Sequence, residues 1–186
     1  FSRGSLPSEQ ARFDRVDKEF RSIMADIEAD KRVIQFAKRN LKEKLKTTLE
    51  QLEICQRALN AFLEEKRSAF PRFYFIGDDD LLEILGQGSD PTTIQKHLLS
   101  IFANIAHVDF DTNKNRKNYI IAMNSAEGEK VKFCEPVIAK GNVEEWLLKL
   151  VAEMKYTMND IIRQMSSTVL SDLANCDRES LQKFID

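Results

Sequence analysis

The stretch of this 186-residue chain that decides its fold reads Phe70-Pro71-Arg72-Phe73-Tyr74-Phe75-Ile76-Gly77-Asp78-Asp79-Asp80-Leu81-Leu82-Glu83. Four of its first six residues are aromatic, and each aromatic side chain can remove roughly 150–250 Å² from water when it packs. Pro71 ends a helix that arrives from the N-terminal side, and Asp80 with Glu83 has the spacing of a capping box for a new helix. The stretch therefore predicts a rigid, packed corner that joins two helices.

The candidate packing or docking residues of this corner are Phe70, Pro71, Arg72, Phe73, Tyr74 and Phe75. Alternation along an extended segment predicts that Phe73 and Phe75 point inward and that Tyr74 points the other way. The sequence leaves two roles open for Arg72. It either contacts a partner through its charge, or extends from the corner into water.

Two long helices are predicted before the corner. The first runs from Ser8, as N-cap, to Glu28, and its apolar residues recur at steps of three and four: Phe13, Val16, Phe20, Ile23 and Ile27. The second runs from Lys31 to Ala69, and its stripe consists of Leu41, Leu45, Leu49, Leu52, Cys55, Leu59 and Phe62. At ~1.5 Å per residue the second helix would be about 55 Å long. Because its seven-residue pattern is short, it indicates the spine of a bundle rather than a free coiled coil.

After the corner the sequence predicts short helices, a small sheet and C-terminal helices. A helix over 80–85 ends at Gly86 and Gly88, and one from Pro91 to Ala103 is capped by Asp90. Three β-favouring segments, 108–110, 119–123 and 130–133, predict an antiparallel meander at about 107–134. Asn142, with Glu145, caps a helix that ends in 166–168, and 177–185 predicts a last helix. The predicted buried face of the helix after Asn142 consists of Val143, Trp146, Leu147, Leu150, Met154, Met158, Ile161 and Met165.

These elements indicate a mainly α protein, an elongated helical bundle with a small antiparallel β-meander inserted. Its predicted parts are residues 1–76, two long helices that end in the aromatic corner, and residues 77–186. The two parts are expected to belong to one larger structure rather than to be independent domains.

Composition excludes several classes of partner. The 28 basic and 30 acidic residues give a net charge of −2, so there is no basic excess for binding nucleic acid. No apolar run approaches the 18 residues of a membrane span. Three widely spaced cysteines suit a reducing compartment. His97 and His107 are expected to be surface or boundary residues rather than metal ligands.

No catalytic, cofactor or metal site is predicted. The carboxylates of Asp78, Asp79 and Asp80 fit a helix start, where acidic groups are favourable. None of the glycines stands in a Gly-x-x-x-x-Gly-Lys-Ser/Thr phosphate loop, and there is no Gly-x-Ser-x-Gly sequence. We therefore expect a chain that is not itself an enzyme.

The stretch 70–87, preceded by Phe62-Leu63-Glu64-Glu65-Lys66-Arg67-Ser68-Ala69, resembles the central part of the linker of dynein heavy chains. The similarity continues through Ala122-Met123-Asn124-Ser125-Ala126-Glu127-Gly128-Glu129-Lys130-Val131 and Gly141-Asn142-Val143-Glu144-Glu145-Trp146-Leu147, and covers nearly the whole chain. The sequence of residues 75–80 is most similar to that of the intraflagellar-transport class of cytoplasmic dynein, and the outer-arm axonemal class comes next.

This resemblance implies a non-catalytic lever that changes shape and docks on the AAA+ ATPase ring of the same heavy chain. Further implied partners are the rest of the linker, the tail and, only through the parent motor, the microtubule. ATP and magnesium would be bound by the ring and not by this segment. The implied location is the cytoplasm and the cilium or flagellum, where such a motor drives retrograde transport.

A lever needs a few compliant points, and the breaks at 70–77, 86–90 and 134–141 are the candidates, with Gly77, Gly86, Gly88 and Gly141 as hinge residues. Two other functions stay open from the residues alone. One is a helical scaffold or cargo-adaptor fragment, and the other is a hydrolase that uses the acidic run.

Overall fold

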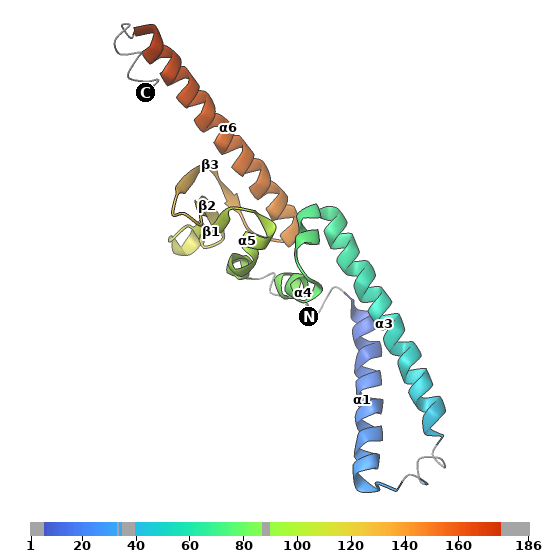
Figure 1. The fold of residues 1–186 in the computed structure, drawn as a ribbon. Helices are drawn as coiled ribbons and strands as arrows, with labels where there is room; N and C mark the ends of the chain where they lie inside the picture. Colours follow the sequence, from blue (N-terminus) through green and yellow to red (C-terminus); the bar gives the residue numbers. More distant parts are fainter. Residues whose placement is uncertain (1–5, 33, 35–39, 87–89, 176–186) are drawn as a thin grey trace. The chain divides into compact units, whose positions relative to one another are not determined.

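The structure, a computed structural model, describes residues 6–32, 34, 40–86 and 90–175. It consists of two compact units, 1–87 and 88–186. Most of the described residues are helical, and a single three-stranded sheet lies in the second unit (Figure 1). This agrees with the predicted mainly α fold with a small antiparallel meander.

Two long helices, α1 (Pro7–Ala29) and α3 (Leu41–Ala69), form most of the first unit. The first lies where the sequence predicts it, but Ser8 is not its cap, since the N-cap residue is Leu6 and makes no side-chain bond. The second begins ten residues after the predicted Lys31. Asn40 adopts the left-handed conformation, with φ of 50°, and a right-handed helix cannot continue through such a residue. Part of the predicted start lies outside the described residues.

The helices α1 and α3 run antiparallel, side by side (Figure 1). Arg12 Nη1 donates to Gln51 Oε1 at 2.7 Å, and Cys55 Sγ lies 3.8 Å from the Glu9 carbonyl oxygen. Between these contacts and the end of the pair where α1 ends and α3 begins, the buried residues are Val16, Ile23 and Thr48.

The predicted stripes of α1 and α3 are wrong in part, because each helix buries only the strip that faces the other. On α1, Phe13 and Phe20 are exposed. On α3, the exposed members of the stripe are Leu45, Leu49 and Leu52.

The first unit closes with a 3₁₀ helix, η1 (Pro71–Phe75), and the short helix α4 (Asp78–Gly86). The second unit begins with the 3₁₀ helix η2 (Pro91–His97) and the single turn α5 (Leu98–Ile101), in place of the one predicted helix. Asp90 caps η2 as predicted: its carboxylate accepts from the Thr92 amide at 3.0 Å.

The sheet is an antiparallel meander of β1 (Ile105–Phe110), β2 (Tyr119–Ser125) and β3 (Lys130–Ile138), with β2 in the middle. A short 3₁₀ turn, η3 (Lys114–Arg116), lies between β1 and β2. In the register, Val108 pairs with Met123, which pairs with Val131. The predicted meander is confirmed, and each strand is longer than predicted.

Side chains satisfy some of the open backbone groups at each edge of the sheet. The Gln95 amide on η2 donates to the Val108 carbonyl at 2.6 Å and accepts from the Val108 N–H at 3.1 Å. On the other edge, Thr157 Oγ1 accepts from the Cys134 N–H at 3.1 Å and donates to Glu153 at 2.9 Å. Edge groups that are occupied in this way are not available for pairing with a further strand.

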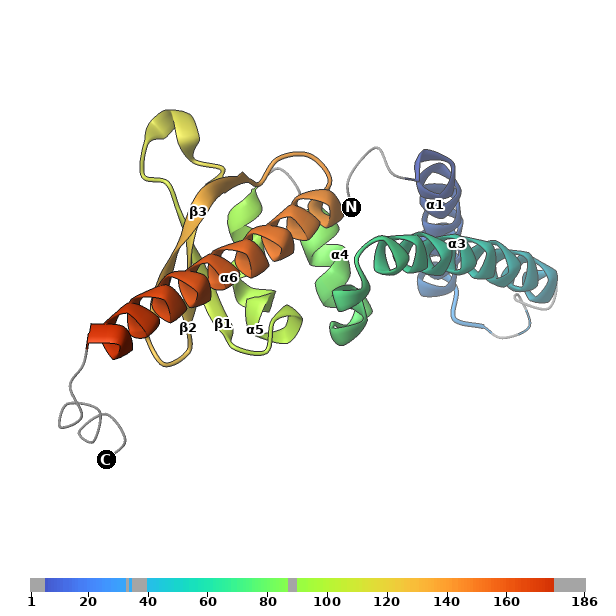
Figure 2. The same cartoon turned by 90° about the horizontal axis from the view of Figure 1, so that it is seen from above.

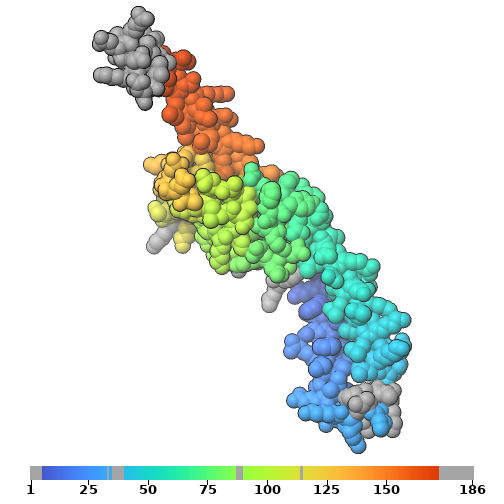
Figure 3. Space-filling model, viewed as in Figure 1, coloured from blue at the N-terminus to red at the C-terminus, as the bar shows by residue number. Residues whose placement is uncertain are grey.

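Helix α6 (Val143–Asn175) packs along β3 with its first half (Figure 2). Asn142 precedes it, as predicted, and donates to the Glu145 carboxylate at 2.7 Å. The residues of its predicted face that are buried are Val143, Trp146, Leu147, Leu150 and Met154. Met158 and Met165 are exposed, contrary to prediction, because α6 extends past the sheet, as its orange and red atoms show in Figure 3.

Helix α6 also extends beyond the predicted end at 166–168, and the predicted helix 177–185 lies outside the described residues. Among the helices of the described ranges, none combines the length and the apolar character that a bilayer crossing requires.

Candidate functional site at the aromatic corner

The aromatic corner is a turn of 3₁₀ helix that follows α3. Side chains at i and i+3 of such a helix lie in line, and Phe70, Phe73 and Ile76 have this spacing. All three are buried, Phe73 completely, and the rings of Phe70 and Phe73 meet edge to face at 4.9 Å between centroids and 74° between planes. The corner is therefore a packed part of the core, as predicted.

Phe75 is not part of that core. It is 72% exposed, and Tyr74 is 55% exposed. The prediction for Tyr74 is confirmed, but the one for Phe75 is wrong, because it assumed an extended segment with a period of two. A period of three places Ile76, and not Phe75, beside Phe73.

Two side chains of the last turns of α3 hold the corner. Arg67, whose side chain is 16% exposed, forms an ion pair of 2.6 Å with Asp78 and donates to the Ile76 carbonyl at 3.4 Å. The Tyr74 hydroxyl donates to the Glu64 carboxylate, and this hydrogen bond raises the pKa of Tyr74. Sequence reasoning missed Glu64 and Arg67. Their partners, Tyr74 and Asp78, lie ten and eleven positions later, a spacing that no helical periodicity indicates.

The three consecutive aspartates, 78–80, lie at the start of α4, but the helix begins at a different residue from the one predicted. The Gly77 carbonyl accepts the first helical hydrogen bond, from the Leu81 amide at 3.0 Å, so Gly77 and not Asp80 occupies the N-cap position. Asp78, Asp79 and Asp80 all lie in the first turn, where the helix dipole favours negative charge. Asp78 has the Arg67 guanidinium as its counter-ion, which gives it a structural role.

The candidate hinge residues lie at the ends of elements. Gly77 joins η1 to α4, and a Cβ added there would meet no atom within 4 Å. Gly86 is the last residue of α4, Gly141 has φ of 87° just before α6, and Gly88 lies outside the described residues. The hinge role of these glycines stays a prediction.

The predicted break at 134–141 is mostly strand, since β3 continues to Ile138, and only the last three residues connect it to α6. A break in this region is therefore shorter than predicted. At Gly141 the positive φ favours glycine, because other L-residues rarely adopt it.

The two histidines differ in their surroundings. His97 is buried, which corrects its prediction as a surface or boundary residue, because it lies three positions after buried Ile94 on η2. His107 is exposed on β1, and its Nε2 lies 3.9 Å from Asp109. Lys130 lies 2.6 Å from the same carboxylate and lowers the pKa of Asp109.

Residues 2–165 match the family described as Dynein heavy chain, N-terminal region 2. The chain belongs to the dynein heavy chain family. It is 53% identical over 169 residues to Cytoplasmic dynein 2 heavy chain 1 of Homo sapiens, which covers 90% of this chain and 4% of the relative. The same protein of Chlamydomonas reinhardtii is 50% identical over 159 residues, 85% of this chain and 4% of the relative.

Dynein axonemal heavy chain 5 of Rattus norvegicus is 42% identical over 166 residues, 88% of this chain and 5% of the relative. These values confirm the resemblance to the intraflagellar-transport class of cytoplasmic dynein, with an axonemal class next. This heavy-chain segment spans only about 4% of the length of the cytoplasmic dynein 2 relatives that it matches.

Proposed function

We propose that this segment is part of the linker of its dynein heavy chain and works as a non-catalytic lever between the AAA+ ring and the tail. The observation that carries the proposal is the corner itself. In the stretch that most resembles the linker, the end of α3 is locked to the next helix by the Phe70–Phe73 ring pair and by Arg67. A stiff joint of this kind transmits force, so under this proposal the lever bends at the other predicted breaks, 86–90 and 139–141, and not at 70–77.

The long helices support the same role. α3 and α6 contain 29 and 33 residues without a glycine or proline, which corresponds to about 43 and 50 Å at ~1.5 Å per residue. Stiff helices separated by short connections suit an element that has two arrangements. Ring states that bind these arrangements unequally would shift their populations and so produce the stroke.

ATP hydrolysis is assigned to the ring, and this segment is proposed to bind neither nucleotide nor metal. Its partners would be the ring, the remaining linker and the tail of the same heavy chain, with the microtubule contacted only through the whole motor. The similarity to cytoplasmic dynein 2 heavy chains favours a cytoplasmic and ciliary motor that drives retrograde intraflagellar transport.

The test compares Phe73→Ala with Phe75→Ala in the complete heavy chain. Softening the corner by Phe73→Ala should slow microtubule gliding several-fold while basal ATP turnover remains, because lever and ATPase are separate parts. Phe75→Ala removes an exposed ring and serves as the matched control for packing. Equal loss of ATP turnover and gliding in Phe73→Ala would contradict the lever role, as would unchanged gliding in a variant whose corner is shown to be loosened by hydrogen exchange.

A further inference from the structure

Strand β3 contains a bulge, a stretch that β2 does not pair with in the regular way. Ile120 of β2 pairs with Val137, and Ala122 pairs with Lys132. The single β2 residue between these two pairs therefore lies opposite four β3 residues, 133–136. A bulge interrupts the ladder of hydrogen bonds, so the backbone groups within it need other partners.

Helix α6 supplies those partners through its side chains. Thr157 Oγ1 accepts from the Cys134 N–H at 3.1 Å, and the Glu153 carboxylate accepts from the Glu135 N–H at 3.0 Å. The Thr157 hydroxyl in turn donates to Glu153 at 2.9 Å, and the Cys134 thiol lies 3.9 Å from the Asp160 carboxylate. The three α6 residues follow one another at steps of four and three, so they lie on one side of the helix. We call these five residues the bulge contact.

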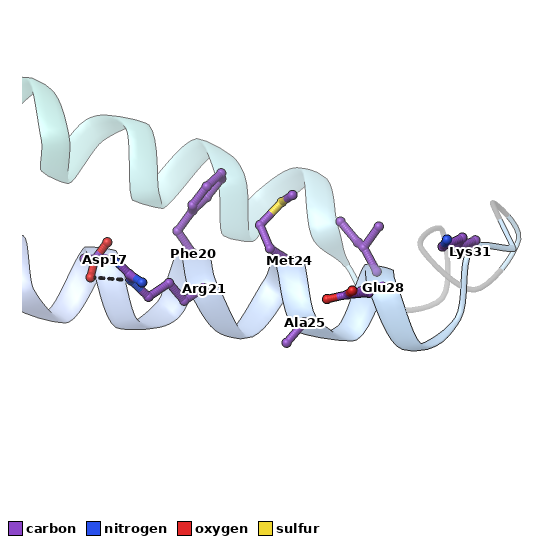
Figure 4. A pocket seen from close by; sticks show the side chains of 8 residues that line it. Asp17, Phe20, Arg21, Met24, Ala25, Glu28 and Lys31 are labelled. Atoms are coloured by element: carbon purple, nitrogen blue, oxygen red, sulfur yellow. Dashed lines mark hydrogen bonds and ion pairs between the residues drawn. The ribbon is translucent and has the colours of Figure 1, made fainter.

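The bulge contact differs from polar contacts that stay within one helix. Asp17 and Arg21 of α1, for example, form an ion pair of 2.7 Å between neighbouring turns (Figure 4). A pair of this kind leaves its helix able to tilt as a unit. Thr157 and Glu153 instead bind the backbone of another element. A change in the tilt of α6 at these residues must therefore stretch or break their hydrogen bonds.

The bulge contact lies where α6 leaves the sheet. The side chain of Thr157 is buried, and none of the α6 residues 158–171, for which the structure describes burial, is buried. From Thr157 to the end of α6 at Asn175 the helix continues for about 27 Å at ~1.5 Å per residue. We call residues 158–175 the projecting part of α6. A small tilt at Thr157 becomes a large displacement at the end of this part.

The bulge contact is weaker than the apolar contacts that precede it on α6. The exposed side chains of Cys134, Glu135 and Tyr156 lie at or next to it, so water can reach its backbone groups once the hydrogen bonds part. A hydrogen bond that exchanges with water contributes less to stability than a fully buried apolar side chain. The buried apolar residues of α6, which we call its anchor, are Val143, Trp146, Leu147, Leu150 and Met154.

We propose that the bulge contact is a latch, which sets the direction in which the projecting part of α6 leaves the sheet and which opens while the anchor stays in place. When the latch is closed, α6 and the sheet form one stiff body. When it is open, the projecting part tilts about the end of the anchor near Met154. The inference concerns the positions of α6 and does not depend on the lever role.

Double electron–electron resonance in the complete heavy chain tests the latch. Nitroxide labels are attached to p-acetylphenylalanine, which replaces Glu127 in the turn between β2 and β3 and Leu170 in the projecting part. Both positions are exposed. Dilution with unlabelled heavy chain suppresses distances between chains. Leu170 lies about 20 Å beyond Thr157 along the helix axis, so a tilt of about 20° would move it by about 7 Å.

Four variants separate the latch from ordinary helix contacts. Thr157→Val keeps the shape of the side chain but removes the hydroxyl, whereas Thr157→Ser retains a hydroxyl. Glu153→Leu removes the acceptor of the Glu135 N–H and so opens the latch without a change at Thr157. Thr168→Val is the matched control, because the Thr168 hydroxyl donates to the Gln164 carbonyl of the same helix at 3.0 Å. Hydrogen exchange of peptides that contain residues 134–135 measures the latch bonds themselves.

The opened latch should be visible in both measurements. Thr157→Val should speed hydrogen exchange of the two bulge amides about five-fold, and should shift or broaden the distribution of the 127–170 distance by about 5 Å. Glu153→Leu should act in the same way. Thr157→Ser and Thr168→Val should match the unchanged heavy chain in both measurements.

Three results would overturn the proposal. Faster exchange in Thr157→Val with an unchanged distance distribution would mean that apolar packing alone sets the direction of α6. Unchanged exchange would mean that α6 does not hold the bulge amides. A shift in Thr157→Ser or in Thr168→Val as large as in Thr157→Val would mean that the hydroxyl at position 157 is not the cause. Neither measurement involves gliding or ATP turnover, so failure here is distinguishable from failure of the lever role.

Discussion

Replacing Phe73 by Ala is the most direct test of how the corner is held together. The side chain of Phe73 is fully buried, and its ring contacts Phe70 edge to face at 4.9 Å between centroids. Removing such a ring costs about 3–5 kcal/mol, the sum of lost burial and of the cavity that remains. About 0.5–1.5 kcal/mol of stability beyond burial comes from an aromatic pair, so Phe73→Leu, which keeps much of the volume, should cost less than Phe73→Ala.

The matched control is Phe75→Ala, two positions away on the same 3₁₀ turn. Because Phe75 is 72% exposed, its loss should change the free energy of unfolding by no more than about 0.5 kcal/mol. Urea denaturation of the 186-residue chain, followed by circular dichroism at 222 nm, measures the free energies. Hydrogen exchange of peptides that contain residues 70–77 localises the effect.

The test is the ranking of the three variants by their loss of unfolding free energy. We expect Phe73→Ala to be most destabilising, Phe73→Leu intermediate, and Phe75→Ala close to the unchanged chain. If Phe75→Ala destabilises as much as Phe73→Ala, the corner has the alternating geometry of an extended segment, and the account based on a period of three is refuted.

Three further predictions concern side-chain contacts, and a fourth concerns nucleotide binding. Arg67→Met should destabilise the chain by about 1–2 kcal/mol, since the side chain is mostly buried and makes charged hydrogen bonds, while Arg57→Met on the exposed side of α3 should have little effect in the same urea titration. Gln95→Leu leaves the N–H and the carbonyl of Val108 on the β1 edge without their side-chain partner and should cost about 1–3 kcal/mol, measured by the fluorescence of the single tryptophan, which lies in the second unit. Asp109→Asn should be less stable than the unchanged chain at pH 7. The depressed pKa of Asp109, caused by Lys130, gives stability that is complete above the unfolded pKa of about 3.9 and is lost as pH falls through the folded value, so urea titrations should show the difference shrinking below about pH 4. Purified chain should show no rise in melting temperature with ATP, where a ligand at 100 times its dissociation constant would add about 2.7 kcal/mol, and a clear rise would contradict the proposal that this segment binds no nucleotide.

Local sequence determined where most elements lie. Helix α1, the three strands and the cap at Asn142 follow from periodicity, β propensity and capping chemistry, which act between residues a few positions apart. The resemblance to the dynein heavy chain linker likewise rests on contiguous residues, and the family comparison confirms the heavy chain.

Tertiary structure decided which apolar residues are buried. Leu45 of α3 and Met165 of α6 belong to regular apolar stripes, yet both are exposed, because burial depends on whether another element covers the stripe. Periodicity indicates which face of a helix is apolar, but it does not say whether another element covers that face.

The corner shows the same division between sequence and tertiary structure. Its aromatic content predicted a packed site, while the 3₁₀ geometry and the Arg67–Asp78 ion pair decided that Ile76 replaces Phe75 in the core. The sequence by itself determined that the corner exists and that it joins two helices. Packing in three dimensions sets two features of the corner: the ion pair between Arg67 and Asp78, and the three-residue period of the 3₁₀ turn. No local propensity encodes either of them.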